Sequence, residues 1–482
     1  MWQDMMKKQK KIAQNYIYQC AANLVAVLVP LIMTPYLSRV LGPEGIGISS
    51  YTGSVVSAFG MFAVLGAHDY GRLEIASSGD DLHKRSRVFW EIILFKCGTC
   101  LALVPLYYLY VCRQQRYTGY LMLQSVCFVS ILTDIGWAYQ GMEAFRQLAL
   151  RTIVARLASI VLILRFVRDK GDLTASLLIS VLTTPLMNLT LFIPLRRKLC
   201  RVKISELHPA AHTKSIFTFF LPILAAQLYL HIDKVMLGRF ASSIAESAYY
   251  EQARKATEII TTLIVTINAV MVPRIARLYA QGETEQIRKH YQHSLRLILM
   301  LALPAAVGLF LISDHFVLWF FGEGYDKVAV LMKLSGVMIV FSSAGSFVGS
   351  QYLIPTRQQY KATAIYAITS CLNILMNALL IPRLYSVGAM AASLLAEGLS
   401  CALQMSLLLR SPYRFPLLEG VHRYLIGTAC MGAAVWAVGH TVSLSLSLTL
   451  LAEVAAGVAV YVVCLLVMRE PVFRMLRKKR PE

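Results

Sequence analysis

Residues 294–320 read SLRLILMLALPAAVGLFLISDHFVLWF, which is almost entirely apolar and long enough to cross a lipid bilayer as one helix. About fourteen stretches of this kind follow one another along the 482-residue chain, with short connections between them. Hydrophobic residues make up 57% of the sequence and charged residues 15%, which is more apolar surface than a water-soluble domain can bury. In lipid, a chain satisfies its backbone hydrogen bonds by forming helices. The sequence therefore predicts an all-α, polytopic membrane protein.

The predicted transmembrane segments have the approximate bounds 12–36, 45–66, 88–111, 118–139, 149–167, 173–194, 215–237, 246–273, 294–320, 328–350, 362–382, 387–409, 422–440 and 446–468. The connections are too short to hold a soluble domain. The N-terminal stretch is longer than a signal peptide and lacks a small-residue cleavage pattern, so we expect a retained helix.

Orientation follows from the 47 Lys and Arg residues, most of which fall in alternate connections. The richest basic stretches are Lys7–Lys11, Arg72–Arg87, Arg196–Lys214 and Arg469–Arg480. The positive-inside rule places these stretches and both termini in the cytoplasm. This arrangement, with the attraction of anionic lipids, explains the net charge of +21. Nucleic-acid binding is not expected, because the basic residues lie at helix ends and not on one soluble face.

The segments predict an internal repeat. Arg39 follows the first segment and Arg239 follows the seventh, in similar surroundings. We expect two six-helix lobes in a parallel pseudo-two-fold repeat, with a substrate path between them, plus two extra C-terminal helices. The predicted parts are an N-terminal lobe (1–194), a basic cytoplasmic linker (195–214), a C-terminal lobe (215–410), and helices 13 and 14 with a basic tail (411–482).

No metal or cofactor is expected. Most of the ten cysteines lie in apolar segments, where they behave as small hydrophobic residues. Cys97 and Cys100 have CxxC spacing, but no second pair and no histidine accompany them in the sequence. The chain also lacks a glycine-rich phosphate-binding loop, so we expect no built-in ATPase.

Six bases fall inside the predicted helices: Lys96, Arg156, Lys234, Arg254, Lys255 and Lys333. An ionisable group there costs about 2.5–3.5 kcal/mol on insertion scales, so each needs a partner, a watery cavity or a function. Lys96 has no acid at similar depth on its own helix. It is the strongest single candidate for contacting an anionic substrate.

Two interhelical ion pairs are predicted from depth. Asp134 and Arg156 lie equally far from the turn between the fourth and fifth segments, so we expect them at similar depth in the membrane. Lys234 and Glu251 likewise lie at similar distances from the turn between the seventh and eighth segments.

The eighth segment carries Glu251, Arg254, Lys255 and Glu258 on one helical face. These residues either neutralise one another by i,i+4 pairing or form the polar wall of a cavity.

Other polar residues within the helices suggest further roles. Asn15, Gln19 and Asn23 form a polar stripe on the first segment, suited to helix–helix hydrogen bonding or to lining a cavity. Glu397, near the middle of the twelfth segment, is a candidate proton or cation site.

Several motifs then carry a family resemblance. They are PYLSRVLGPEGIG at residues 35–47, YGR at 70–72, DIGWAYQGME at 134–143, IDKVMLG at 232–238 and the tyrosine pair at 249–250. Together they resemble the Wzx-type polysaccharide flippases of the multidrug/oligosaccharidyl-lipid/polysaccharide exporter superfamily, over essentially the whole chain. The motif residues we single out are Arg39, Gly42, Gly45, Gly47 and Arg72. Glu246 stands in a stretch where such proteins usually carry a glycine, so the outer loop is expected to differ.

The resemblance implies a transporter and not an enzyme. Such proteins move an undecaprenyl-pyrophosphate-linked oligosaccharide to the outer leaflet of a bacterial cytoplasmic membrane by alternating access, for O-antigen or capsule export. The resemblance also implies that membrane lipids, a polysaccharide polymerase and chain-length proteins are partners. Lys96, Arg156 and Lys234 offer cations for the pyrophosphate, with Arg254 and Lys255 as further candidates.

Two alternatives from the same superfamily remain open, namely a multidrug exporter and a flippase for the peptidoglycan lipid precursor. The driving force is also open. The membrane potential favours outward movement of two negative charges by roughly 4–5 kcal/mol per 100 mV, and ion antiport through Glu397 or the Asp233 region is the rival.

Overall fold

The computed structural model describes residues 2–470 apart from 418 and 443, and their side chains apart from those of 2–13, 15–17, 23, 27, 221–223 and 225–230. Within this part of the chain all regular secondary structure is helical. The prediction of an all-α protein is therefore confirmed.

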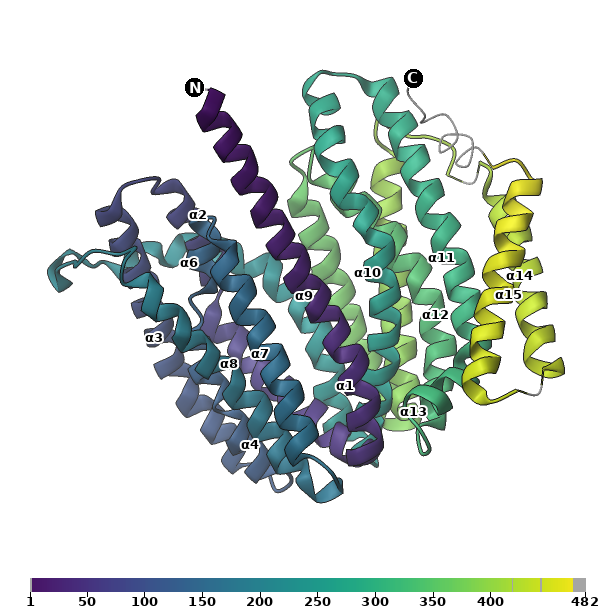
Figure 1. The fold of residues 1–482 in the computed structure, drawn as a ribbon, viewed down its shortest axis with the longest axis horizontal. Helices are drawn as coiled ribbons and strands as arrows, with labels where there is room; N and C mark the ends of the chain where they lie inside the picture. Colours follow the sequence, from purple (N-terminus) through teal and green to yellow (C-terminus); the bar gives the residue numbers. More distant parts are fainter. Residues whose placement is uncertain (1, 418, 443, 471–482) are drawn as a thin grey trace. The chain divides into compact units, whose positions relative to one another are not determined.

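The chain divides into two compact units, Met1–Gly238 and Arg239–Glu482. The first contains α1 (Trp2–Val64), α2 (Ala67–Ser77), α3 (Leu82–Cys112), α4 (Thr118–Gln124), α5 (Cys127–Thr133), α6 (Gly136–Gly141), α7 (Phe145–Phe166), α8 (Leu173–Leu195) and nearly all of α9 (Thr213–Phe240) (Figure 1). The second contains α10 (Ala245–Ala280), α11 (Thr284–Phe320), α12 (Asp326–Phe347), the π-helical turn η4 (Val348–Leu353), α13 (Gln359–Leu409), α14 (Val421–Thr441) and α15 (Leu446–Val467).

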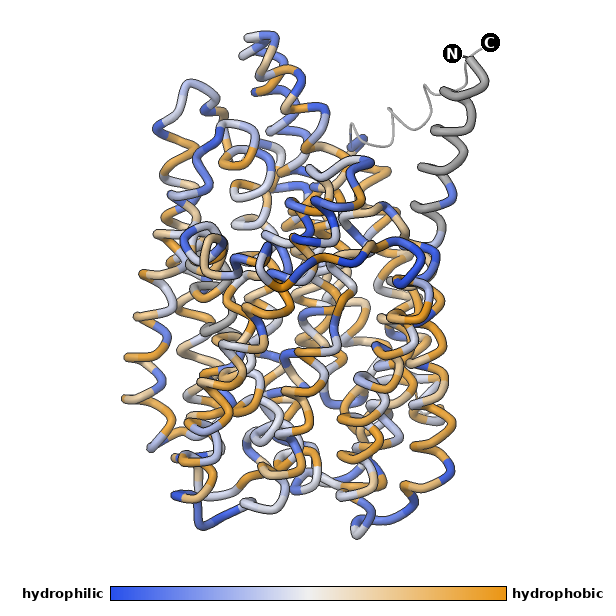
Figure 2. Tube along the Cα trace, turned by 90° about the vertical axis from the view of Figure 1, so that its left-hand side faces the viewer, coloured by the Kyte–Doolittle hydropathy of each residue, from blue (hydrophilic) through white to orange (hydrophobic). Residues whose placement is uncertain are grey.

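Ten helical stretches in the described part are long and apolar enough to cross a membrane. Two of them, Tyr18–Ser77 and Gln359–Leu409, each contain two of the predicted segments. Helices α9 and α14 cover the remaining two predicted segments. Apolar residues dominate the middle of the helices, and polar residues gather at their ends and in the connections (Figure 2). The chain is therefore a multi-pass membrane protein.

Breaks in the backbone explain the two double-length stretches. In α1, Gly42 has φ 70° and ψ 177°, a conformation that only glycine adopts readily. Figure 1 shows α1 running down from the N-terminus and turning back at its lower end. In α13 the break lies at Tyr385, with φ 52° and ψ −126°. Both breaks fall between predicted segments, so each long stretch contains two spans.

One predicted segment is not a single helix. Residues 118–139 fold as α4, α5 and the start of α6, and the chain leaves the helical conformation at Asp134 (ψ 105°). The apolar pattern predicted the span correctly, but a break of one or two residues leaves the average hydropathy unchanged. This break frees the backbone carbonyl of Asp134 for another partner.

A buried aromatic cluster joins α2, α3 and α6. Phe89 stacks on Trp137 with ring centroids 5.7 Å apart, and the Tyr139 hydroxyl donates to the Leu191 carbonyl at 2.6 Å. A Cβ at Gly71 would lie 2.7 Å from the Trp137 ring, and one at Gly141 would lie 2.6 Å from the Arg72 carbonyl oxygen. The two glycines of the YGR and DIGWAYQGME motifs therefore let α2 and α6 touch.

The predicted linker 195–214 is anchored to the first unit. The buried carboxylate of Glu91 accepts from the His208 backbone N–H at 2.9 Å and lies 2.8 Å from His212 Nε2. The other ring nitrogen of His212 lies 2.8 Å from the Tyr70 hydroxyl, and Arg87 donates to Glu91 at 3.1 Å. We call these residues the linker clasp.

Helix α9 belongs with the first compact unit, whose boundary falls after Gly238 and not near 214. A Cβ at Gly66 would lie 2.9 Å from the Phe220 backbone nitrogen, and one at Gly238 would overlap the Tyr51 ring. These close approaches explain why α9 associates with α1 and α2. The pseudo-symmetric arrangement of two six-helix lobes remains a prediction.

Glu246 has a structural role in the second unit. Its buried carboxylate accepts from Lys327 Nζ at 2.6 and 2.8 Å, and from the Ser386 backbone N–H at 3.0 Å. The Ser386 hydroxyl donates to it as well. Ser386 directly follows the break at Tyr385, so Glu246 ties α10 and α12 to the bend of α13.

Candidate functional site

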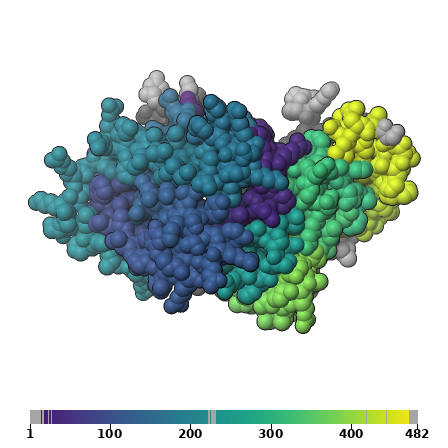
Figure 3. All heavy atoms as spheres, turned by 90° about the horizontal axis from the view of Figure 1, so that it is seen from below, coloured from purple at the N-terminus to yellow at the C-terminus, as the bar shows by residue number. Residues whose placement is uncertain are grey.

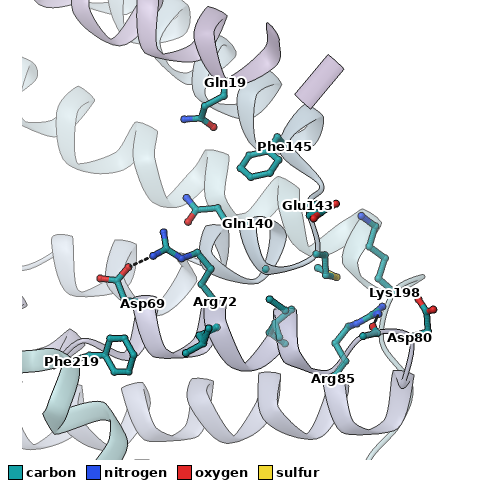
Figure 4. Close-up of a pocket in the computed structure, with 16 residues that line it drawn as sticks. Gln19, Asp69, Arg72, Asp80, Arg85, Gln140, Glu143, Phe145, Lys198 and Phe219 are labelled. Carbon is teal, nitrogen blue, oxygen red and sulfur yellow. Dashed lines mark hydrogen bonds and ion pairs between the residues drawn. The ribbon is translucent and has the colours of Figure 1, made fainter. Parts of the chain in front are cut away.

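A cavity of about 1200 Å³ lies in the first unit, where α2, the α2–α3 turn, α6 and the start of the linker meet (Figure 4). Its polar and aromatic lining residues are Gln19, Asp69, Arg72, Asp80, Arg85, Gln140, Glu143, Phe145, Lys198 and Phe219. Figure 3 shows the opposite end of this unit, which closely packed side chains cover. We call this space the Arg72 cavity.

The Arg72 cavity contains three basic and three acidic side chains. The Arg72 guanidinium lies 3.0 Å from the Asp69 carboxylate, and both side chains are about half exposed. Arg85 donates to the Gly79 carbonyl, which holds it against the turn that carries Asp80. The side chains of Lys198 and Glu143 point toward one another in Figure 4.

This arrangement suits a ligand that is both anionic and rich in hydroxyls. Guanidinium groups bind phosphates through two parallel hydrogen bonds, and the compact ammonium of Lys198 adds a point charge. The carboxylates and the amides of Gln19 and Gln140 offer acceptors and donors for hydroxyl groups. The Phe145 ring, between these two amides in Figure 4, gives one wall an apolar face.

The local fold positions these side chains. Asp81 caps α3, because its carboxylate accepts from the Lys84 backbone N–H at 3.0 Å, and this bond lowers the pKa of Asp81. The cap ends the turn at residues 78–81, and Arg85 lies one helical turn further along α3. Glu143 has φ 55°, which closes the turn after α6 and carries the chain into α7. Lys198 is held with its Nζ 5.1 Å from the centre of the Tyr139 ring.

Two of the predicted site residues, Gln19 and Arg72, line the Arg72 cavity. The side chains of Asn15 and Asn23 lie outside the described residues. Lys96 does not line the cavity. It is fully buried, and its Nζ donates to the Asp134 backbone carbonyl at 2.8 Å. In this structure Lys96 therefore satisfies the carbonyl that the break after α5 leaves free.

The predicted Asp134–Arg156 pair is absent from the described residues. Asp134 Oδ1 accepts instead from the Gly136 backbone N–H at 2.9 Å, and Arg156 is exposed on α7. The chain bends at Asp134, so counting residues from the hairpin turn misplaced this carboxylate.

The charges of α10 pair along their own helix. Lys255 lies 2.6 Å from Glu251, and Arg254 lies 3.9 Å from Glu258, both at i,i+4 spacing. Lys234 belongs to the first unit and Glu251 to the second, so their predicted pairing remains a prediction.

The other predicted residues are not among those that line the Arg72 cavity. Asp233 is buried in α9, Glu397 is partly exposed on α13, and Arg39 is exposed just before the break in α1. Gly45 follows that break, and a Cβ there would lie 2.9 Å from Leu41 Cβ. Lys333 pairs with Asp314 at 2.6 Å.

The sequence reasoning missed most of the cavity's charges. Gln140 and Glu143 stand in the quoted DIGWAYQGME motif, so the motif itself could have suggested them. Arg85 and Lys198 fall in basic stretches, whose pattern indicates only cytoplasmic charges that set the topology. Their place in a cavity depends on how the linker folds back, which no local pattern shows.

Comparison with known proteins gives a consistent result. Residues 12–279 match the family model described as "Polysaccharide biosynthesis protein". The chain is 22% identical over 409 residues to a putative O-antigen transporter of Escherichia coli K12, covering 83% of this chain and 97% of that protein. It is also 22% identical over 464 residues to the probable flippase AglR of Haloferax volcanii, covering 94% of each.

Solved structures share the fold at low sequence identity. A structure of the lipid II flippase MurJ in an inward closed conformation has a TM-score of 0.78 at 15% identity, covering 95% of this chain and all of that chain. An inward-facing multidrug transporter of the MATE family has a TM-score of 0.60 at 13% identity, covering 83% of this chain and 99% of that one. These similarities bear on the fold alone.

Proposed function

The chain belongs to the family of polysaccharide biosynthesis proteins, and on that premise we propose that it moves a lipid-linked oligosaccharide diphosphate across a bacterial cytoplasmic membrane. It is a flippase of the Wzx type and a transporter, not an enzyme. The undecaprenyl carrier and the direction of movement, from the inner to the outer leaflet, belong to the proposal.

The Arg72 cavity is the observation that carries this proposal. Its three bases suit the two phosphates, and its carboxylates and amides suit the hydroxyls of a sugar chain. The lipid tail can stay in the bilayer, since only the polar head has to leave water.

The charge pattern supports the orientation. The Arg72–Arg87 and Arg196–Lys214 stretches flank the cavity and are among the most basic connections, so the positive-inside rule puts this end of the unit in the cytoplasm with both termini. Lipid-linked oligosaccharides of this kind carry two phosphates. A negative interior therefore favours their outward movement by roughly 4–5 kcal/mol per 100 mV.

Reconstitution into liposomes tests the proposal. The wild-type protein should speed leaflet exchange of a fluorescent undecaprenyl-diphosphate oligosaccharide under an imposed potential. Arg72→Ala should slow the exchange at least tenfold, because one phosphate contact to a charged group is worth about 1.5–3 kcal/mol. Arg165→Ala is the matched control, since Arg165 is an exposed arginine of the same unit, on α7, that does not line the cavity. A wild-type protein that leaves exchange unchanged, or equal losses in both variants, would contradict the proposal.

A flippase for the peptidoglycan lipid precursor is the second candidate, suggested by partial matches to curated relatives. A probable lipid II flippase of Rhizobium meliloti is 24% identical over 214 residues, but the match covers only 41% of this chain and 40% of that protein. Rescue of a strain depleted of its own lipid II flippase would favour this candidate. Rescue of a strain lacking its O-antigen flippase would favour the first, in which a polysaccharide polymerase and chain-length proteins act as partners.

A multidrug exporter is less well supported. The Arg72 cavity contains equal numbers of acidic and basic side chains, so the charge count favours neither cationic drugs nor a diphosphate. The similarity to a putative O-antigen transporter supports the lipid-linked substrate instead. Increased drug resistance of cells that overexpress this protein would support the multidrug exporter and contradict the flippase proposal.

A further inference from the structure

The middle of the linker forms a hook that stands out from the first unit. At its start, the Cys200 backbone N–H donates to the Ser86 hydroxyl at 2.8 Å. At its end, Glu206 Oε2 lies 2.8 Å from His83 Nε2, so both ends are tied to the first turns of α3. Residues 201–205 lie between these ties, and Figure 1 shows this segment at its far left, extending sideways from the helices. We call residues 201–205 the linker hook.

The linker hook combines a bare apolar side chain with bases. Ile204 is 87% exposed, the highest value among the large hydrophobic side chains that the structure describes. Arg201 and Lys203 flank this tip and are exposed, and two further exposed bases, Arg196 and Arg197, precede the hook. Water is a poor solvent for an isoleucine side chain. The pattern therefore suits a surface that is anionic outside and apolar beneath.

The depth of the linker hook in the membrane follows from α3. Trp90 is 40% exposed on this helix, and tryptophan side chains gather at the boundary between lipid and water. Leu94, one turn deeper, is also exposed, as a side chain facing lipid would be. Ser86, which holds Cys200, precedes Trp90 by four residues and so lies about 6 Å nearer to the water. The hook therefore lies in the layer of the lipid head groups, next to the acyl chains.

We propose that the linker hook binds anionic phospholipid, with Arg201 and Lys203 on the phosphates and Ile204 among the acyl chains. Basic segments are attracted to anionic leaflets, and an apolar side chain that enters the acyl layer adds an attraction that salt does not screen. Bases that serve only to orient the chain need no exposed apolar tip between them. The position of Ile204 is thus the observation that favours lipid contact, and it does not depend on what the protein transports.

Binding of lipid by the hook also affects the Arg72 cavity. Lys198 lines that cavity and precedes Cys200 by two residues. Because Cys200 is bonded to Ser86, a lipid that holds the hook at the membrane surface also holds Lys198 close to the level of the lipid phosphates. On the proposed function, the diphosphate of the substrate lies in this same layer. It could reach Lys198 without leaving the head groups.

Quenching of a fluorescent label by brominated lipid tests the proposal. The full chain, with its native cysteines replaced, carries Ile204→Cys labelled with bimane in vesicles of equal parts phosphatidylglycerol and phosphatidylcholine. In each sample only one of the two lipids has brominated acyl chains. Each base near an anionic surface changes affinity about fivefold, so brominated phosphatidylglycerol should quench at least about twofold more than brominated phosphatidylcholine. Arg201→Gln combined with Lys203→Gln should make the two values equal.

Three controls fix the meaning of the signal. A label at Leu101→Cys, exposed in the middle of α3, should be quenched equally by the two lipids. A label at Gln281→Cys, exposed at the end of α10, should be quenched by neither. Arg277→Gln combined with Lys289→Gln removes two exposed bases from the second unit and should leave the Ile204→Cys signal unchanged.

A measurement without labels keeps the test decisive if the cysteine-free protein fails to fold. Native mass spectrometry counts the phosphatidylglycerol molecules that the purified protein retains. The Arg201→Gln, Lys203→Gln variant should retain fewer than the wild type, and the Arg277→Gln, Lys289→Gln variant should retain as many. Equal quenching of Ile204→Cys by the two lipids, or retention that the hook variant leaves unchanged, would overturn the proposal. An unquenched label would overturn it as well, because the hook would then lie in water, where a soluble protein could dock.

Discussion

Replacing Glu246 with glutamine removes one buried charge and leaves the shape of the side chain intact. In the structure, this carboxylate accepts from Lys327, from the Ser386 backbone N–H and from the Ser386 hydroxyl. The amide of Glu246→Gln would place an NH₂ group against one of these donors. Lys327, which is 31% exposed, would lose its counter-ion and Ser386 one acceptor.

The magnitude follows from burial. Removing one partner of a buried ion pair costs about 3–5 kcal/mol, and the partial exposure of Lys327 reduces this to roughly 2–4 kcal/mol. The apparent Tm of the purified protein in detergent should fall by about 2–4 °C, because the entropy of unfolding grows with chain length. The Lys333–Asp314 pair is a matched control, with the same 2.6 Å separation in the same unit, but its carboxylate is 64% exposed where that of Glu246 is 9% exposed. Asp314→Asn should cost about 0–1 kcal/mol.

A double-mutant cycle completes the experiment. Lys327→Met in the Glu246→Gln background should cost less than it does alone, since the lysine no longer has a counter-ion to lose. Equal losses of Tm in Glu246→Gln and Asp314→Asn would refute the reasoning, because distance rather than burial would then set the energy. Additive effects in the cycle would show that the two side chains act independently.

Three further predictions concern the first unit. Gly42→Ala should destabilise the protein by about 1–3 kcal/mol, because a Cβ is strained at φ 70° and ψ 177°. The control Gly98→Ala has nothing within 4 Å of its new Cβ and should be neutral or mildly stabilising. Thermal unfolding of both variants checks this, and equal effects would contradict it. Lys96→Met should lower stability by about 1–3 kcal/mol, because the Asp134 carbonyl loses its donor, and an unchanged Tm would show that another group satisfies that carbonyl. In intact cells a membrane-impermeant maleimide should label a variant whose only cysteine is Cys112, which is exposed at the end of α3. A variant whose only cysteine is Cys200 should be labelled only once the cells are permeabilised. The reverse pattern would invert the proposed orientation.

The sequence predicted where the helices lie because apolar length is a local property. The same reasoning failed where the backbone bends without a change of composition. At Asp134 the helix breaks inside an apolar stretch, which moved the carboxylate away from Arg156 and freed the carbonyl that Lys96 now binds. Lys96 had no acid at its own depth on its helix, and its partner is a main-chain oxygen that side-chain spacing cannot show.

The candidate site was only partly predictable for a related reason. Arg72 and Gln19 stood out because one lies in a motif and the other on a polar stripe. Arg85 and Lys198 lie in basic stretches, where the positive-inside rule already accounts for them. Their common position depends on contacts between residues far apart in the chain, such as that of Glu91 with His212. Glu246 was noted as a departure from the family pattern, but its partner Ser386 lies 140 residues away.

The linker clasp has a consequence for how the polypeptide can be divided. Because Tyr70 and Glu91 hold His212, the segment before α9 behaves as part of the first folding unit and not as a free tether. A gene cut between the codons for Phe240 and Ala245, in the turn that separates α9 from α10, leaves the linker clasp within one product. Two such fragments should reassemble when produced together. A cut near Cys200 would instead put His212 on a different fragment from Tyr70 and Glu91, which hold it.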